Sequence, residues 1–137
     1  MKKLILFFLF LLASIAVQGQ EWVDDKSFDN VIGQGGFDDS QDIIIIEFWA
    51  EFNSKNAFHD WKEIDDLEDV KYYRCDVALS PESKKKFRVR MVPTILIFAG
   101  GDAFIKFKAK AGLDLLCPVD VNKMKAAVEV VRRESQF

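Results

Sequence analysis

The sequence predicts an α/β protein in which helices cover both faces of a central, mixed β-sheet. The first observation is the run Ile43–Ile46: four consecutive isoleucines cannot alternate between core and water, so this strand is buried on both faces. The second is that apolar residues recur at intervals of three and four after this strand and again at the end of the chain, as in amphipathic helices. The third is a hairpin turn at Gly100–Asp102, which adds an antiparallel strand.

The beginning of the chain is expected to be a secretion signal. Two lysines precede the apolar run Leu4–Leu12, which is shorter than the roughly 20 residues that span a bilayer. Small residues allow cleavage after Ala16 or after Gly19, and we favour the second. We therefore expect residues 1–19 to be a signal peptide and 20–137 to be one exported domain, periplasmic or secreted and no longer attached to the membrane.

Composition excludes several functions. The 137 residues include 19 basic and 22 acidic ones, a net charge of −3, so we expect no attraction to nucleic acid or anionic membranes. Two cysteines are too few for a disulfide scaffold, and a single histidine, His59, excludes a multi-histidine metal site or a histidine-based triad. We expect no catalytic residue of these kinds, no metal and no cofactor.

The first elements are short. Trp22–Val23 is a strand candidate, and a helix capped by Asp24 or Asp25 is expected to end near Ile32. The glycine-rich segment 33–36 follows a helix and leads into a strand, which is the reverse of a phosphate-binding loop, so it is interpreted as a connector.

The central strand runs to Trp49 and leads into a predicted helix. Asn53 and Ser54 are good N-cap residues, and the helix is expected to extend from Ser54 to about Leu67. Its apolar residues share one face: Ala57, Phe58, Trp61, Ile64 and Leu67.

The next strand is expected over Val70–Val77, followed by a helix that Ser80 caps and Pro81 opens, ending near Phe87. Five basic residues crowd the end of this helix: Lys84, Lys85, Lys86, Arg88 and Arg90. Two interpretations stay open, an acidic partner and a solvated helix end whose cations complement the helix dipole, and we favour the second.

The last elements are a hairpin and a helix. Met91–Phe98 and Ala103–Lys110 are predicted to pair around the glycine turn. Asp120 is expected to cap a final helix. Its apolar residues are Val121, Met124, Val128 and Val131.

Two segments carry a family resemblance. Residues 47–56 read E-F-W-A-E-F-N-S-K-N, which resembles the active-site strand and turn of thioredoxins, D-F-W-A-x-W-C-x-x-C. The segment Met91–Thr94 resembles the second thioredoxin signature, in which the proline is cis and lies against that turn. The similarity covers nearly all of residues 21–133, apart from an insertion at Gly112–Pro118. It implies a thioredoxin-like fold.

The resemblance fails at both cysteines. Asn53 and Asn56 stand where thioredoxins have the attacking and resolving thiols, so we expect a redox-inactive protein and lean against an enzyme. The alternative is slow thiol–disulfide chemistry at Cys117 or Cys75. Whether these two are bridged or free stays open.

Without redox chemistry, the function that the resemblance still implies is binding. The resemblance implies a cis-proline groove for an extended polypeptide or a protein partner, with the Val92 backbone left open for strand pairing. The groove residues are Trp49, Phe52, Asn53, Asn56, Val92 and Pro93. In the alternatives, the Gly112–Pro118 insertion covers Phe52, or the domain is a purely structural component of an assembly. We expect a monomer.

Glu47 stands where thioredoxins keep a buried acid for proton transfer. Without thiols nothing catalytic requires it, so we expect Glu47→Gln to stabilise the protein at neutral pH. The alternative is a satisfied ion pair, for example with Arg74.

Overall fold

The computed structural model describes residues 19–33, 42–109 and 114–135. The predicted signal sequence up to residue 18, most of the connector, Lys110 and the start of the insertion lie outside these ranges. None of the described helices is both long and apolar enough to cross a membrane.

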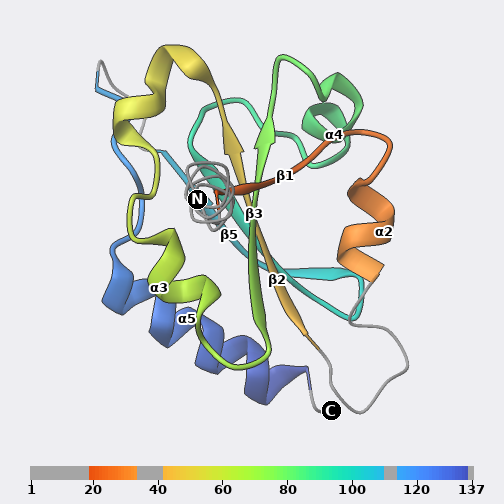
Figure 1. Ribbon diagram of the computed structural model, residues 1–137, viewed down its shortest axis with the longest axis vertical. Coiled ribbons are helices and arrows are strands. Elements are labelled where there is room, and N and C mark those ends of the chain that lie inside the picture. The colour runs from red at the N-terminus through yellow and green to blue at the C-terminus, as the bar shows by residue number, and fades with distance from the viewer. Residues whose placement is uncertain (1–18, 34–41, 110–113, 136–137) are drawn as a thin grey trace, which may run out of the picture.

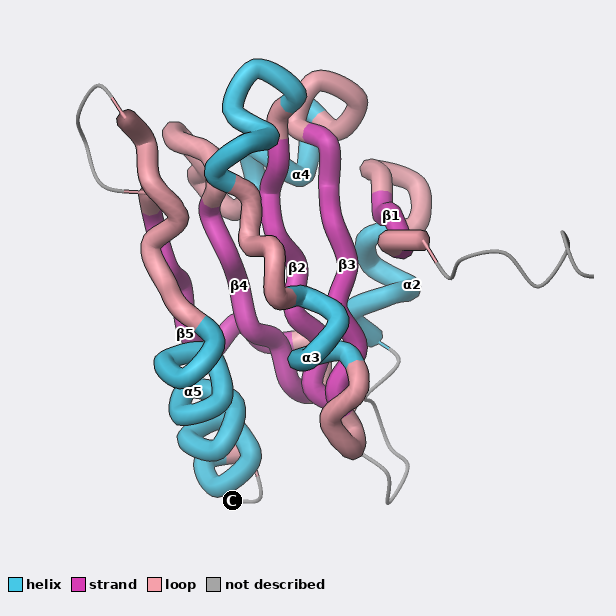
Figure 2. The backbone as a smooth tube through the Cα atoms, turned by 60° about the vertical axis from the view of Figure 1, so that its left-hand side comes forward, coloured by secondary structure: helices cyan, strands magenta, loops and turns pink. Residues whose placement is uncertain are grey.

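Five strands form one mixed sheet, as predicted. Their spatial order is β1 (Glu21–Val23), β3 (Val70–Asp76), β2 (Ile43–Trp49), β4 (Thr94–Ala99) and β5 (Asp102–Lys108). The strands β1, β3 and β2 run parallel, whereas β4 and β5 pair antiparallel. Figure 2 shows this order edge to edge, with β2 in the middle.

Helices cover both faces. The helical elements are α2 (Phe28–Ile32), the 3₁₀ helix η2 (Glu51–Asn56), α3 (Trp61–Asp65), α4 (Pro81–Lys86) and α5 (Val121–Glu134). The helices α2 and α4 lie on one side of the sheet, and α3 and α5 lie on the other (Figure 1).

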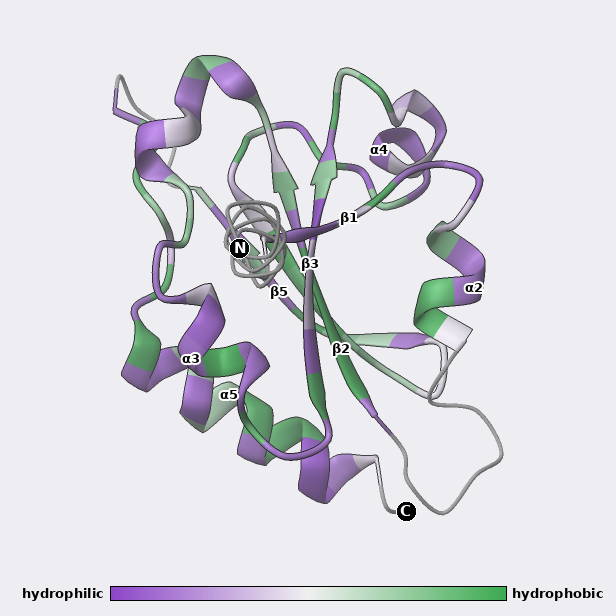
Figure 3. Cartoon of the chain, viewed as in Figure 1, coloured by the Kyte–Doolittle hydropathy of each residue, from purple (hydrophilic) through white to green (hydrophobic). Residues whose placement is uncertain are grey.

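The central strand supplies the core on both sides. Ile44, Ile46 and Phe48 pack in the cluster that includes α2, while Ile43 and Ile45 pack against α3 and α5. All five side chains are at most 2% exposed. Burial of each such side chain contributes about 1.5–3 kcal/mol, so this strand is a large part of the stability. Figure 3 shows much of β2 in the hydrophobic colour.

The prediction of one continuous helix over residues 54–67 is wrong. The chain forms η2, leaves helical geometry, and resumes as the short α3. The break occurs because Phe58 makes its backbone bonds elsewhere: its N–H donates to Glu47 Oε2 (3.2 Å) and its carbonyl accepts from Arg74 (2.8 Å). A buried ion pair therefore replaces the intrahelical bonds.

One predicted cap is wrong and another acts on a different helix. Ser80 precedes α4 but its hydroxyl makes no capping bond. Instead the carboxylate of Asp25 accepts from the N–H groups of Glu82 (3.1 Å) and Ser83 (2.7 Å) at the start of α4. Asp24 stabilises the turn before α2. Asp25 thus ties the first segment of the domain to α4.

Candidate functional site

The candidate site lies at the edge of the sheet where the parallel strands end. The carboxyl end of β2 leads into η2, and the loop before β4 carries Val92 and Pro93. The peptide bond between Val92 and Pro93 is cis. In α/β proteins this edge of the sheet is where ligands bind.

Asn53 joins three segments of the chain at this edge. Its side chain is buried, with 7% exposed, and its Nδ2 donates to the carbonyl oxygens of Val92 (2.9 Å) and Leu115 (3.0 Å). The turn, the cis-proline loop and the loop before α5 are therefore held by one amide group.

Asn56 completes this arrangement. Its Nδ2 donates to Asn53 Oδ1 (2.8 Å) and to the Asp114 carbonyl (2.7 Å). A side-chain amide has two N–H donors, so all four donors of the pair are used. Turning either amide over would set its oxygen against carbonyl oxygens. We call the two asparagines and the three carbonyl groups of Val92, Asp114 and Leu115 the asparagine clasp.

The clasp corrects two expectations. Asn53 was expected to cap a helix, but its backbone is not helical (φ −122°, ψ 25°) and its donors point to other loops. The Val92 backbone was expected to be open for a bound strand, yet its carbonyl oxygen accepts from Asn53. Within the described residues nothing accepts from the N–H of Val92, a residue that is 6% exposed.

Apolar side chains flank the clasp. Phe52, which precedes Asn53, is 76% exposed, and Leu116, which follows Leu115, is 56% exposed. The alternative in which the insertion covers Phe52 is therefore wrong. Phe52 is the most exposed large hydrophobic side chain among the described residues.

Trp49 lies apart from the clasp. It is half-buried and packs edge-to-face on Trp22, with 5.0 Å between ring centroids. Together with Leu79 and Asp76 these rings line a hollow of about 410 Å³ that contains no other predicted groove residue. Sequence reasoning missed Trp22 and Leu79. The shared carboxyl ends of the parallel strands β1, β2 and β3 were the signal that could have found them.

Glu47 is a satisfied buried acid, which is the alternative we considered. Its carboxylate is fully buried and accepts from Tyr72 Oη (2.6 Å), Arg74 Nε (3.2 Å) and the Phe58 N–H. Burial, followed by the neighbouring Glu47 charge, raises the pKa of Tyr72 well above its usual value, so the phenol keeps its proton and donates. The expectation that Glu47 is an uncompensated charge is wrong.

The cysteines do not form a pair. Cys75 packs with the α2 side of the sheet and Cys117 with the α5 side, and both thiols are free. Burial raises the pKa of Cys75 to about 11 and raises the pKa of Cys117 as well. Both thiols are therefore protonated at neutral pH and are poor nucleophiles.

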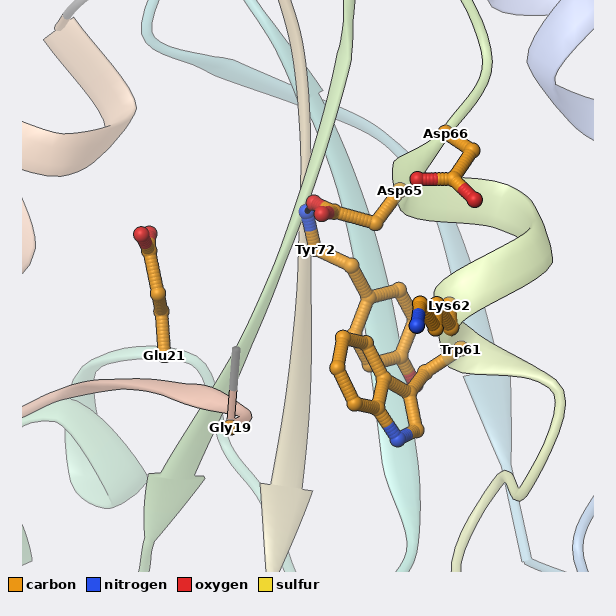
Figure 4. Close-up of a pocket in the computed structure, with 7 residues that line it drawn as sticks. All are labelled: Gly19, Glu21, Trp61, Lys62, Asp65, Asp66 and Tyr72. Atoms are coloured by element: carbon orange, nitrogen blue, oxygen red, sulfur yellow. Dashed lines mark hydrogen bonds between the residues drawn. The ribbon is translucent and has the colours of Figure 1, made fainter. Parts of the chain in front are cut away.

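A second hollow, of about 250 Å³, lies between α3 and the start of the first strand (Figure 4). Its carboxylates come from Glu21, Asp65 and Asp66. The Asp65 carboxylate accepts a hydrogen bond from the Tyr72 N–H (2.8 Å). It contains no predicted site residue. Among the described residues, no three histidine, cysteine or acidic side chains are placed to hold a metal ion.

Comparisons with known proteins agree with the fold described above. The family model described as Thioredoxin matches residues 20–119. No curated protein sequence matches the chain significantly.

Solved structures match at the level of the fold. A mutant thioredoxin from Halobacterium salinarum NRC-1 has a TM-score of 0.63 and 17% identity, covering 81% of this chain and 88% of its own. Thioredoxin f from spinach chloroplast has a TM-score of 0.64 and 15% identity, with 85% and 96% covered. A Malassezia sympodialis thioredoxin has a TM-score of 0.61 and 20% identity, with 82% and 90% covered.

Proposed function

Because this chain belongs to the thioredoxin family, we propose that it is a member in which polypeptide binding has replaced thiol–disulfide exchange. The proposal places binding at the rim of the asparagine clasp, around Phe52. Export of the domain is part of the same proposal.

The loss of redox chemistry is supported by the clasp. Thiol–disulfide exchange needs a thiolate and a second thiol that resolves the mixed disulfide. Asn53 and Asn56 supply neither, and all their amide donors are used within the protein. The raised pKa values of Cys75 and Cys117 argue against a substitute nucleophile.

The exposure of Phe52 is the observation that carries the binding proposal. Burying a phenyl ring in an interface contributes about 1.5–3 kcal/mol before the entropic cost of association. The Val92 N–H, which has no acceptor among the described residues, supplies one backbone hydrogen bond to an extended chain in this proposal. A contact of this size gives weak affinity, with a Kd of about 1 μM or higher.

An NMR titration of the domain with an unfolded polypeptide tests the proposal. We expect shifts at Phe52, Val92 and Leu116, and we expect Phe52→Ala to weaken binding about tenfold. Phe104→Ala is the matched control, since Phe104 is a partly exposed phenylalanine on the edge strand β5. Equal effects of the two substitutions, or shifts confined to other surfaces, would show that the rim is not the site. If no polypeptide binds, the role of a purely structural component replaces this one.

Export has its own test. N-terminal analysis of the chain recovered from outside the cytoplasm is expected to give Gln20 as the first residue. A chain recovered only inside the cell with Met1 or Lys2 at its start would contradict export.

A further inference from the structure

A second surface, beside α4, is built differently. It is an open groove of about 610 Å³. Its aliphatic lining comes from Val77, Pro81 and Val89, and its charged lining comes from Lys84, Lys85, Arg88 and Arg90. The four cationic side chains are exposed. We call this surface the basic groove.

The cations of the basic groove are not neutralised. The ion pairs within the described residues involve Lys71, Arg74, Lys86, Lys125 and Arg132, and none involves a groove cation. The full chain has a net charge of −3, so this concentration of positive charge is local. A solvated helix end explains the lysines of α4, but not the continuation of the positive charge onto other segments.

A lysine from β5 reinforces the positive field. Lys106 Nζ donates to the carbonyl oxygens of Phe87 (2.7 Å) and Arg88 (3.3 Å), which places it directly behind the groove. Burial lowers the pKa of Lys106, and the charges of Lys108, Arg88 and Arg90 lower it further. Lys106 therefore adds a positive charge close to Arg88 and Arg90.

Arg88 occupies a backbone position that favours glycine. Its φ is 53°, in the left-handed region, immediately after α4. The following N–H, from Val89, donates to the Lys84 carbonyl (2.9 Å), which closes the helix end in a Schellman-type turn. Glycine would adopt this conformation without strain. The chain thus carries a long cationic side chain where the fold alone would be better served by glycine.

We propose that the basic groove docks an acidic polypeptide segment that also carries apolar side chains. Carboxylates match the four cations, and aliphatic side chains match Val77, Pro81 and Val89. None of the described residues that line the groove is aromatic, so they give a base no ring to stack on, which disfavours nucleic acid. This inference does not depend on binding at Phe52, because it concerns other residues and another kind of partner.

The test uses a labelled short peptide of alternating glutamate and valine, with fluorescence anisotropy as the readout. We expect binding to weaken about tenfold or more between about 20 mM and about 300 mM salt. Arg88→Gly is expected to weaken binding about threefold while the Tm stays equal or rises, because the left-handed strain is removed. The triple variant Lys84→Gln/Arg88→Gly/Arg90→Gln is expected to lose at least about tenfold.

Matched controls separate the groove from bulk charge. Lys62→Gln/Lys123→Gln/Arg133→Gln removes the same three charges from the α3 and α5 side and is expected to leave affinity unchanged. Phe52→Ala is likewise expected to leave this affinity unchanged, which separates the inference from the function proposed above. Equal losses in the two triple variants, or equal binding of a lysine–valine peptide, would overturn the proposal. Tighter binding of a single-stranded oligonucleotide would overturn the choice of partner.

Discussion

Glu47 shows how the surroundings of a single residue reverse an expectation. From the sequence, a buried acid without a thiol partner should cost stability at neutral pH. In the structure it pairs with Arg74 and accepts from Tyr72 and Phe58, so its charge is matched. Removing one partner of a buried pair leaves the other uncompensated.

We therefore predict that Glu47→Gln lowers the free energy of unfolding by about 2–3 kcal/mol at pH 7. Urea denaturation measures it, and Glu51→Gln, at an exposed position in η2, is the control, with an expected change below about 0.5 kcal/mol. A double-mutant cycle with Arg74→Gln should give a coupling of about 1–2 kcal/mol. A rise in the free energy of unfolding would instead show that the charge of Glu47 is not compensated in the wild-type protein.

Asn53 is the second residue whose role depends on its contacts. We predict that Asn53→Ala destabilises the protein by about 2–3 kcal/mol, because it leaves the Val92 and Leu115 carbonyls without their donor. Ser54→Ala is the matched control at the exposed neighbouring position and should change stability by less than about 0.5 kcal/mol. Equal unfolding free energies for the two variants would mean that the clasp contributes nothing.

At the scale of helices and strands, local sequence patterns correctly predicted the features that depend on neighbouring residues alone. The four isoleucines of β2 are buried on both faces of the sheet, and the regularly spaced Met124, Val128 and Val131 of α5 are buried, as the sequence predicts. Asp120 accepts from the Lys123 N–H (2.7 Å), as a capping residue should. Local patterns did not predict the break between η2 and α3 or the cap of α4. Both depend on partners from another segment, namely Glu47 for Phe58 and Asp25 for Ser83.

The cap of α4 gives a pH-dependent prediction. Burial alone would raise the pKa of Asp25, but the hydrogen bonds from Ser83 and Glu82 outweigh it and leave the pKa below the ordinary value of 3.8. A lowered pKa means that the carboxylate stabilises the fold above about pH 4, and that this contribution is lost as the pH falls through the folded value.

Asp25→Ala should therefore lower the Tm at pH 7, and the difference from wild type should shrink towards pH 3. Asp29→Ala is the control, since the side chain of Asp29 forms an exposed ion pair with Lys86. A Tm difference that is the same at both pH values would argue against the carboxylate as the cap.

At the scale of the whole molecule, two motifs far apart in the sequence were sufficient to predict the fold. Residues 47–56 and 91–94 carry the resemblance, and the sheet order and the family match agree with it. The site was predicted less completely. The resemblance named Asn53 and Val92 but not the bond between them, and no local pattern relates Asn53 to Leu115, which is 62 residues away in an inserted loop.

The thioredoxin-like fold with asparagines at positions 53 and 56 predicts that redox activity is absent and that cysteines at these two positions restore it. The wild-type domain should reduce a disulfide substrate no faster than the uncatalysed reaction when a reductant is supplied. Asn53→Cys/Asn56→Cys should introduce a measurable dithiol couple, because the two side chains already touch, with 2.8 Å between their amide groups. Wild-type turnover that Cys117→Ser abolishes would contradict the prediction.

The asparagine clasp also determines how the molecule opens. Its hydrogen bonds connect positions 39, 58 and 62 residues apart, so none of the three loops can leave its place without breaking bonds to the others. Loops at the edge of a domain ordinarily fray independently and exchange their amide hydrogens fast. Because these bonds connect the turn to the loops before β4 and α5, we expect the three segments to open as one cooperative unit, with their backbone hydrogens exchanging at a common, slow rate.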